Sequence, residues 1–370
     1  MKSAIFHHCL CAGGSSRMED FMNIYQLVDN ICLGYVPNIN EVELLLNTDE
    51  PETSYIFDAA DDITRKHCSN KVHIRGIIEF SNYCRCSCAY CGLNVDNREL
   101  KRYRMKPQEI IDVAREAWDA GYRTIVLQSG EDLWYTREKV SFIIKGIKAI
   151  GDIAVTLSVG ERDYEDYRQW KEDGADRFLL KHETINRKLY NKLHPHSVLD
   201  NRILCLWQLK ELKYQTGSGF MIGLPGQTPK DIARDILFLK KLDADMAGIG
   251  PFIPHKGTIM GDNPVGSDVM TLKALAVTRL ILKTVHLPAT TALLTLDGEG
   301  AQKAFNVGAN VIMLKLEPYK YRRLYDIYPK EFGEENNIKK ERLKIEQLIK
   351  NMGKEVAKDR GDSLKGNERL

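Results

Sequence analysis

The sequence lacks several features that mark particular classes of protein. It has no uninterrupted apolar run of about 18 residues, so we predict no transmembrane helix. Its 53 basic and 51 acidic residues leave a formal net charge of only +2, which argues against binding nucleic acid by neutralising phosphates. The N-terminal stretch is broken by His7 and His8, so we interpret it as a leader, or a start assigned too early, rather than a secretory signal. The sequence therefore predicts a cytoplasmic protein without a membrane or nucleic-acid partner.

Cysteine usage argues against a framework of disulfide bonds. The nine cysteines are odd in number and no secretory signal accompanies them, so a reducing compartment is expected. Four of them, Cys84, Cys86, Cys88 and Cys91, fall within eight positions in the stretch CRCSCAYC. A structural zinc site usually needs a second pair of cysteine or histidine ligands, and Cys205 stands alone. An iron–sulfur cluster held by three of the four thiols fits this pattern best.

The chain also lacks a GxGxxG motif after its first predicted strand, which counts against a dinucleotide-binding open sheet. From residue 71 onward, short and continuously apolar runs alternate with helical stretches, as expected for parallel strands buried on both faces. Eight such units predict an α/β fold, a complete (β/α)₈ barrel, with the doubly wound open sheet as the alternative. The predicted strands span residues 71–81, 124–130, 154–160, 177–184, 217–225, 246–254, 289–295 and 310–314.

Three parts of the chain can be distinguished. We predict a leader and helical extension over 1–70, the barrel over 71–330, and a C-terminal helix with a charged tail over 331–370. After Gly353 the tail is almost entirely charged or small, so we expect it to be disordered.

The cysteine cluster follows the first predicted strand at its carboxyl end, where barrel enzymes build their active sites. A cluster held by three thiols leaves one iron open, as an open catalytic metal site does, so that a ligand can complete its coordination. Small residues Ser129 and Gly130 end the second strand and would let a ligand approach the backbone. Which thiol is the spare one is not decided by these residues alone.

The spacing Cys84-x-x-x-Cys88-x-x-Cys91, with Tyr90 before the last cysteine, resembles the signature of radical S-adenosylmethionine (SAM) enzymes. The resemblance implies one [4Fe–4S] cluster bound by these three cysteines, with Cys86 left free, and SAM chelating the open iron. Cleavage of SAM to a 5′-deoxyadenosyl radical would follow. The strings KRYRM, VLQSGED, GLPGQT and GIGPFIPH are most similar to the HydE-type maturases of [FeFe]-hydrogenases, in the barrel group of biotin synthase and methylornithine synthase.

This resemblance also implies roles for residues at the strand ends. Lys181 departs from the arginine that HydE-type enzymes commonly carry there, and a lysine keeps the charge but loses the bidentate fork. The residues implied in cofactor binding are Tyr90, Gln128, Ser129, Gly130, Glu131, Ser158, Glu183, Arg202 and Tyr325. Those implied in substrate binding are Thr156, Lys181, Thr290, Thr291, Met313 and Tyr328.

The substrate implied by the resemblance is a small iron–cysteine–CO–cyanide synthon, with other hydrogenase maturases and a reductant protein as partners. Lys181 keeps open an alternative, a methylornithine synthase-like amino-acid mutase or another radical SAM enzyme acting on a small carboxylate substrate. No cysteine follows Cys205, which excludes the second, C-terminal cluster of some relatives, and the barrel lacks the cysteines expected for sulfur insertion. A non-enzymatic iron–sulfur carrier is the remaining hypothesis, and the residues expected to contact SAM argue against it.

Overall fold

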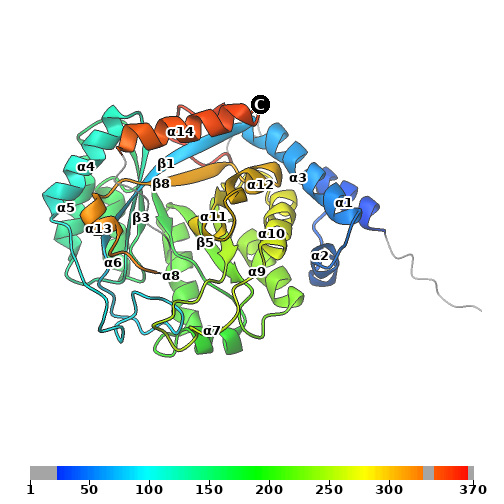
Figure 1. The fold of residues 1–370 in the computed structure, drawn as a ribbon, viewed down its shortest axis with the longest axis horizontal. Coiled ribbons are helices and arrows are strands. Elements are labelled where there is room, and N and C mark those ends of the chain that lie inside the picture. The colour runs from blue at the N-terminus through cyan, green and yellow to red at the C-terminus, as the bar shows by residue number, and fades with distance from the viewer. Residues whose placement is uncertain (1–22, 328–336, 366–370) are drawn as a thin grey trace, which may run out of the picture.

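The computed structural model describes residues 23–327 and 337–365, and its centre is a barrel of parallel strands (Figure 1). Neighbouring strands follow the order β6-β5-β4-β3-β2-β1-β8-β7. A single parallel bridge between Met246 and His286 joins the two ends of this order, so the ring is nearly closed. The strands are β1 (Lys71–Ser81), β2 (Thr124–Ser129), β3 (Ala154–Ser158), β4 (Arg177–Leu179), β5 (Gln215–Ile222), β6 (Met246–Pro251), β7 (Pro288–Ala289) and β8 (Val311–Lys315). The predicted barrel is confirmed.

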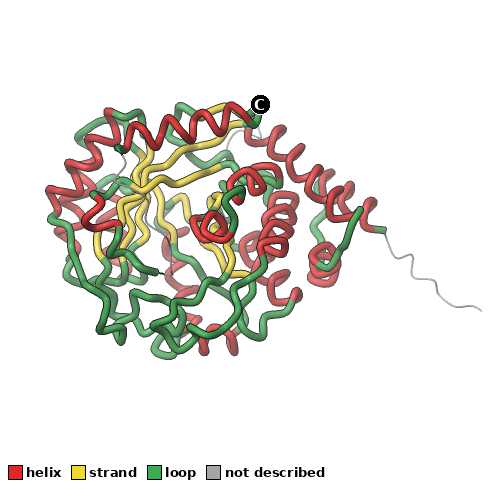
Figure 2. Tube along the Cα trace, in the orientation of Figure 1, coloured by secondary structure: helices red, strands yellow, loops and turns green. Residues whose placement is uncertain are grey.

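Helices surround the barrel, and loops gather along the lower edge of the view in Figure 2. The helices that precede the barrel are α1 (Ile24–Leu33), α2 (Ile39–Leu46) and α3 (Glu52–Cys68). Those between strands are α4 (Pro107–Asp119), α5 (Arg137–Lys148), α6 (Tyr164–Glu172), α7 (Arg187–Leu193), α8 (Leu199–Glu211), α9 (Pro229–Lys241), α10 (Asp268–Ile281), α11 (Thr291–Leu296) and α12 (Gly300–Asn306). After β8 come α13 (Tyr319–Arg322), α14 (Ile338–Asn351) and the short strand β9 (Glu355–Val356). In the described parts of the chain, no helix is long and apolar enough to cross a membrane.

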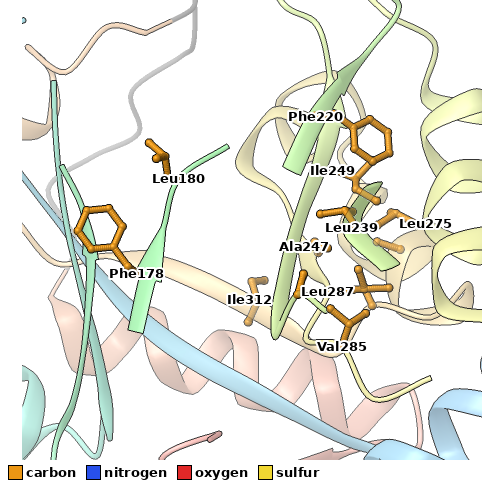
Figure 3. Packing of buried hydrophobic residues seen from close by; sticks show 14 of the residues in the cluster. Phe178, Leu180, Phe220, Leu239, Ala247, Ile249, Leu275, Val285, Leu287 and Ile312 are labelled. Carbon is orange, nitrogen blue, oxygen red and sulfur yellow. The ribbon is translucent and has the colours of Figure 1, made fainter. Parts of the chain in front are cut away.

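The core lies between the strands and the outer helices. Phe220 of β5 and Ile249 of β6 are fully buried and face Leu239 of α9 and Leu275 of α10 (Figure 3). Burying each such side chain contributes about 1.5–3 kcal/mol. Alternate residues of a strand point to opposite faces, so the positions between these apolar residues face the barrel interior, where the site is built.

Local signals fix several helix ends. Thr228 caps α9, and its side chain accepts a hydrogen bond from the amide of Asp231 at 3.2 Å, with Pro229 in the first turn. Helices α1–α3 lie on the outside of the barrel next to α9 and α10 (Figure 1), and the ammonium group of Lys273 on α10 donates to the carbonyl of Thr48. The extension therefore covers one flank of the barrel.

Two predicted strands are much shorter than expected. The run 289–295 contributes only Ala289 to β7, because Thr290 caps a helix and its hydroxyl accepts from the amide of Leu293 at 3.4 Å. A short apolar run does not distinguish strand from helix by periodicity. In 177–184, β4 ends at Leu179. Beyond it, Glu183 forms only a single parallel bridge with Phe220 of β5, and it adopts a left-handed backbone with φ 62°.

The prediction of a disordered tail is wrong for residues 354–365. β9 pairs with β1, and the chain then crosses the amino-terminal end of the barrel. There Arg177, which is fully buried inside β4, donates to the carboxylate of Asp362 at 2.7 Å and to the carbonyl of Arg360 at 2.7 Å. The guanidinium of Arg360 in turn contacts Asp176 at 2.6 Å. Charged tail residues are ordered because buried cations of the barrel need acceptors.

Candidate active site

The four clustered cysteines lie on a loop that follows the carboxyl end of β1. Backbone hydrogen bonds hold this loop to its neighbours: Arg85 donates to the carbonyl of Glu131 after β2 at 3.1 Å, and Ala89 donates to Leu193 at the end of α7 at 2.9 Å. From within the same segment, the guanidinium of Arg102 donates to four main-chain carbonyls. The loop is therefore braced from β2 and α7 before any ligand is present.

All four thiols of this loop are free and half-buried. The sulfur of Cys84 accepts hydrogen bonds from the amides of Cys86 and Glu131, each at 3.4 Å. Hydrogen bonding to the Cys86 thiol, and then burial, raises the pKa of Cys84, while burial raises the pKa of Cys91 to about 12. These thiols need a nearby cation to ionise, which is what an iron centre supplies.

Among the described residues, no three cysteine, histidine or carboxylate side chains are gathered in a geometry that could hold one metal ion. A four-iron cluster takes one thiolate at each ligated iron, so its ligands are spread more widely than those of a single metal ion. Free thiols on one braced loop fit that donor set.

The loop after β2 has no spare room against the cysteine loop. A Cβ atom on Gly130 would lie 2.3 Å from the carbonyl of Tyr83 and 2.8 Å from the Cβ of Cys84. Next to it, the carboxylate of Glu131 accepts from the side chain of Arg85 at 3.1 Å and from the amide of Glu161 at 3.0 Å. The predicted cofactor-binding loop and the cysteine loop thus form one compact unit, in which the carboxylate of Glu131 also lies 3.9 Å from the guanidinium of Arg202.

Lys181 and Glu183 form an ion pair just after the end of β4. The ammonium group of Lys181 lies 3.0 Å from the carboxylate of Glu183, and their side chains are 29% and 12% exposed. Burial is the largest influence and opposes ionisation of Glu183, but the nearby positive groups, Lys181 first among them, together outweigh it and lower the pKa of that carboxyl. Arg202 of α8 donates to the carbonyl of Lys181 at 2.7 Å and to the carboxylate of Glu161 at 2.5 Å. The structure therefore brings these three predicted site residues together.

Strand register assigns several predicted residues to the inside of the barrel. Gln128 pairs with Ser158, and Val126 pairs with Thr156 two residues earlier, so these side chains share one face. The hydroxyl of Thr156 is buried and has no hydrogen-bond partner in the structure. Met313 of β8 pairs with Arg75 of β1, so the two side chains share one face of the sheet. Because the guanidinium of Arg75 reaches the amino-terminal end of the barrel, this face is the inner one.

Glycines leave space opposite Lys181. Gly219 and Gly248 are paired in register on β5 and β6, and a Cβ atom on Gly219 would lie 2.0 Å from the carbonyl of Gly248. A Cβ atom on Gly248 would instead meet only ordinary contacts, the nearest being 3.8 Å from the carbonyl of Ser218 and 3.9 Å from the side chain of Lys181. The wall that faces Lys181 is therefore bare backbone.

Three further predicted residues, Thr290, Thr291 and Tyr325, lie at the barrel's mouth. Thr290 and Thr291 begin α11 instead of ending a strand, and the hydroxyl of Thr290 faces Gly250, where a Cβ atom would come within 2.7 Å of it. Tyr325 is 2% exposed and its hydroxyl bonds to the side chain of Gln128. Tyr328 lies outside the described residues.

Two contacts at the mouth were missed by the sequence analysis because their partners are far apart in the chain. His255 after β6 donates from Nε2 to Asp326 at 2.9 Å, since its Nδ1 accepts from the amide of Gly257 at 3.0 Å. His194, just after α7, places Nδ1 3.2 Å from the sulfur of Cys88. No local motif marks either histidine as part of a site.

A third missed feature is a buried acidic pair beside the mouth. Lys315 of β8 donates to the carboxylate of Glu79 at 2.5 Å, and the amide of Glu79 donates to Glu317 at 3.2 Å. Burial, reinforced by the charge of Glu79, raises the pKa of Glu317 to about 8. Burial of Glu317 beside a second carboxylate thus favours its neutral form.

A pocket of about 310 Å³ opens on the outer side of the cysteine loop. Cys86, Cys88 and His194 line it, together with Glu131 and Glu161. Cys86 and Cys88 thus both face this pocket rather than the packed core.

Comparison with known proteins agrees with this geometry. The family model of the radical SAM superfamily matches residues 78–239. The [FeFe] hydrogenase maturase subunit HydE of Thermotoga maritima is 52% identical over 78% of this chain and 82% of that protein. The 3-methylornithine synthase of Methanosarcina acetivorans is 28% identical over 77% of this chain and 81% of that protein.

Among solved structures, methylornithine synthase superimposes with a TM-score of 0.78 at 24% identity, covering 90% of this chain and 97% of that one. This likeness supports the barrel fold. The superfamily implies a [4Fe–4S] cluster and SAM as cofactors. By its sequence identity over most of its length, the chain belongs to the HydE family of [FeFe]-hydrogenase maturases, within the radical SAM superfamily.

Proposed function

We propose that this enzyme cleaves SAM at a [4Fe–4S] cluster held by Cys84, Cys88 and Cys91, with Cys86 free. The observation that carries the proposal is the bracing of the cysteine loop at the barrel mouth, where the Cys84 sulfur accepts from the amide of Glu131. When bound, the cluster and SAM together supply one-electron chemistry that begins with cleavage of SAM. The protein's own task is to hold both groups and to exclude water from the interior.

Residues around the mouth are suited to orient SAM. Glu183, which has a left-handed backbone at φ 62°, offers a carboxylate to its amino group. Arg202 supplies a planar guanidinium for the carboxylate of SAM. Tyr90 and Tyr325 add aromatic surface, and Ser129, Gly130, Glu131, Gln128 and Ser158 complete the proposed cofactor site.

The interior is suited to a small anionic substrate. The unpartnered hydroxyl of Thr156 can donate to a carboxylate or a cyanide ligand without adding charge, and Lys181 supplies the positive charge. Thr290 and Thr291 lie at the first turn of α11, and Met313 adds an apolar wall. We propose an iron–cysteine–CO–cyanide synthon as the substrate, with a reductant protein supplying the electron and other maturases receiving the product.

Lys181 favours a second candidate, an amino-acid mutase of the methylornithine synthase type. An ammonium group binds a carboxylate as a point charge and does not impose the bidentate geometry of an arginine. The maturase and the mutase would use the same cluster and SAM, and they differ only in the substrate that binds in the barrel interior.

Turnover with alternative substrates separates these candidates. With the reconstituted enzyme, dithionite and SAM, the iron–cysteine synthon is expected to be consumed as 5′-deoxyadenosine forms, while L-lysine remains unchanged. Replacing Lys181 with methionine is expected to raise the synthon concentration for half-maximal turnover about tenfold or more, since a charge-assisted hydrogen bond contributes about 1.5–3 kcal/mol. Lys181→Arg should retain the affinity.

Lys210→Met serves as the matched control, because Lys210 pairs with Asp243 on the outer surface at 3.2 Å. If the enzyme converts L-lysine and does not consume the synthon, the maturase function is wrong and the enzyme is a mutase. Equal synthon affinity in Lys181→Met and Lys210→Met would remove Lys181 from the substrate site.

A further inference from the structure

We propose that His194 is a positioning residue for the cluster, whose Nδ1–H donates to the thiolate of Cys88 and raises the reduction potential of the cluster. The inference rests on the proposed function in one respect, namely that Cys88 is a cluster ligand. The inference concerns the reduction potential of the cluster, which the assignment of Cys88 as a ligand does not determine.

The contact between the two residues is fixed by the fold. Nδ1 of His194 lies 3.2 Å from the sulfur of Cys88, although 106 positions separate them in the sequence. The carbonyl of Leu193 accepts from the amide of Ala89 at 2.9 Å, so the residues directly before His194 and after Cys88 are joined by a backbone hydrogen bond. This clamp places the end of α7 against the cysteine loop.

The ring itself is held on both sides. His194 is 4% exposed, and its ring lies 4.6 Å from that of Tyr190 and 5.8 Å from that of Tyr90, measured between ring centroids. Its own amide donates to the carbonyl of Tyr190 at 2.8 Å. Little freedom remains for the ring to turn Nδ1 away from the sulfur.

The direction of the hydrogen bond follows from the chemistry of a cluster ligand. A thiolate carries no hydrogen and can only accept, so the ring nitrogen that faces it must carry the proton. A neutral imidazole then has no hydrogen on Nε2. In the structure Nε2 is buried without a hydrogen-bond partner, which suits a nitrogen that has no hydrogen to donate.

A hydrogen bond to a ligand sulfur draws electron density away from the cluster. Reduction adds one negative charge to the cluster and its thiolates, so the donor stabilises the reduced form more than the oxidised form. Hydrogen bonds to sulfur, together with net charge and solvent exposure, set cluster potentials. One electron enters and no bond is made or broken, so the step needs only the reductant.

Redox titration of the reconstituted cluster without SAM, followed by electron paramagnetic resonance, tests the proposal. In His194→Phe the ring shape is kept and the donor is lost, and we expect about a tenfold smaller equilibrium constant for reduction, a shift of about 59 mV to more negative potential. In His194→Gln an amide N–H can replace the donor, and part of the shift should be recovered. His196→Phe is the matched control, since His196 is exposed in the same segment.

A cluster potential in His194→Phe equal to that of His196→Phe would overturn the proposal. Where His194→Phe does not load a cluster, the wild-type enzyme labelled with ¹⁵N-histidine decides: the reduced, SAM-free cluster should show a weak ¹⁵N hyperfine coupling, and its absence would equally overturn it. Retention of the cluster in Cys88→Ala would instead show that the ligand assignment is wrong, so the two failures are distinguishable.

Discussion

Replacing Cys84, Cys88 or Cys91 with alanine is expected to abolish the iron–sulfur absorbance near 400 nm and all reductive cleavage of SAM. With the proposed ligands, each variant removes one of three thiolates, so one iron would lose its ligand and the cluster would not be retained. Replacing Cys86 with alanine is expected to leave both properties largely intact. Visible absorbance, iron content and 5′-deoxyadenosine formation after anaerobic reconstitution are the measurements.

The four variants form a closely matched set, because all four thiols lie half-buried on one loop. Cys86 lines the outer pocket, and the amide of Val95 donates to its carbonyl at 2.9 Å, so an alanine there keeps the backbone bracing. Loss of the cluster in Cys86→Ala, or its retention in Cys84→Ala, would mean that another triplet of thiols holds the iron.

Ending the chain at Gly353 is expected to lower the free energy of unfolding by several kcal/mol. The deletion removes β9 and takes from Arg177 the carboxylate of Asp362 and the carbonyl of Arg360. Leaving a buried charge without its partner costs about 3–5 kcal/mol. Urea unfolding of the cluster-free protein, followed by circular dichroism, gives the change in midpoint.

Two variants make this test specific. Deleting only residues 366–370 should leave the urea midpoint unchanged, because none of the tail contacts described for Arg177 involves them. In an Arg177→Met background the buried charge is absent, so the deletion at Gly353 should cost less than in the wild type. An equal cost in both backgrounds would show that the tail does not stabilise the barrel through Arg177.

The site could be predicted from sequence where its signal is local. The spacing from Cys84 to Cys91 and the position of the loop after β1 are both visible in the sequence. Continuous apolar runs identified the strands because parallel strands are buried on both faces.

Prediction failed where a partner distant in the chain decides the structure. The tail after Gly353 is charged and suggested disorder, but the cation that orders it, Arg177, lies on β4. No motif near His194 indicates its contact with Cys88, because that contact arises only when a backbone hydrogen bond joins the end of α7 to the cysteine loop. Composition describes what a segment contains, whereas these outcomes depend on what the barrel places beside it.

Activation of an [FeFe]-hydrogenase that lacks its active-site cluster tests whether this enzyme acts in hydrogenase maturation. A maturation mixture containing the other maturases, SAM and a reductant is supplied with this enzyme or with its Cys88→Ala variant, and hydrogen production is measured. If the enzyme is a maturase and Cys88 is a cluster ligand, hydrogen is produced with the wild-type enzyme and none is produced with Cys88→Ala. Cleavage of SAM by the wild-type enzyme without any hydrogenase activation would contradict the maturase function.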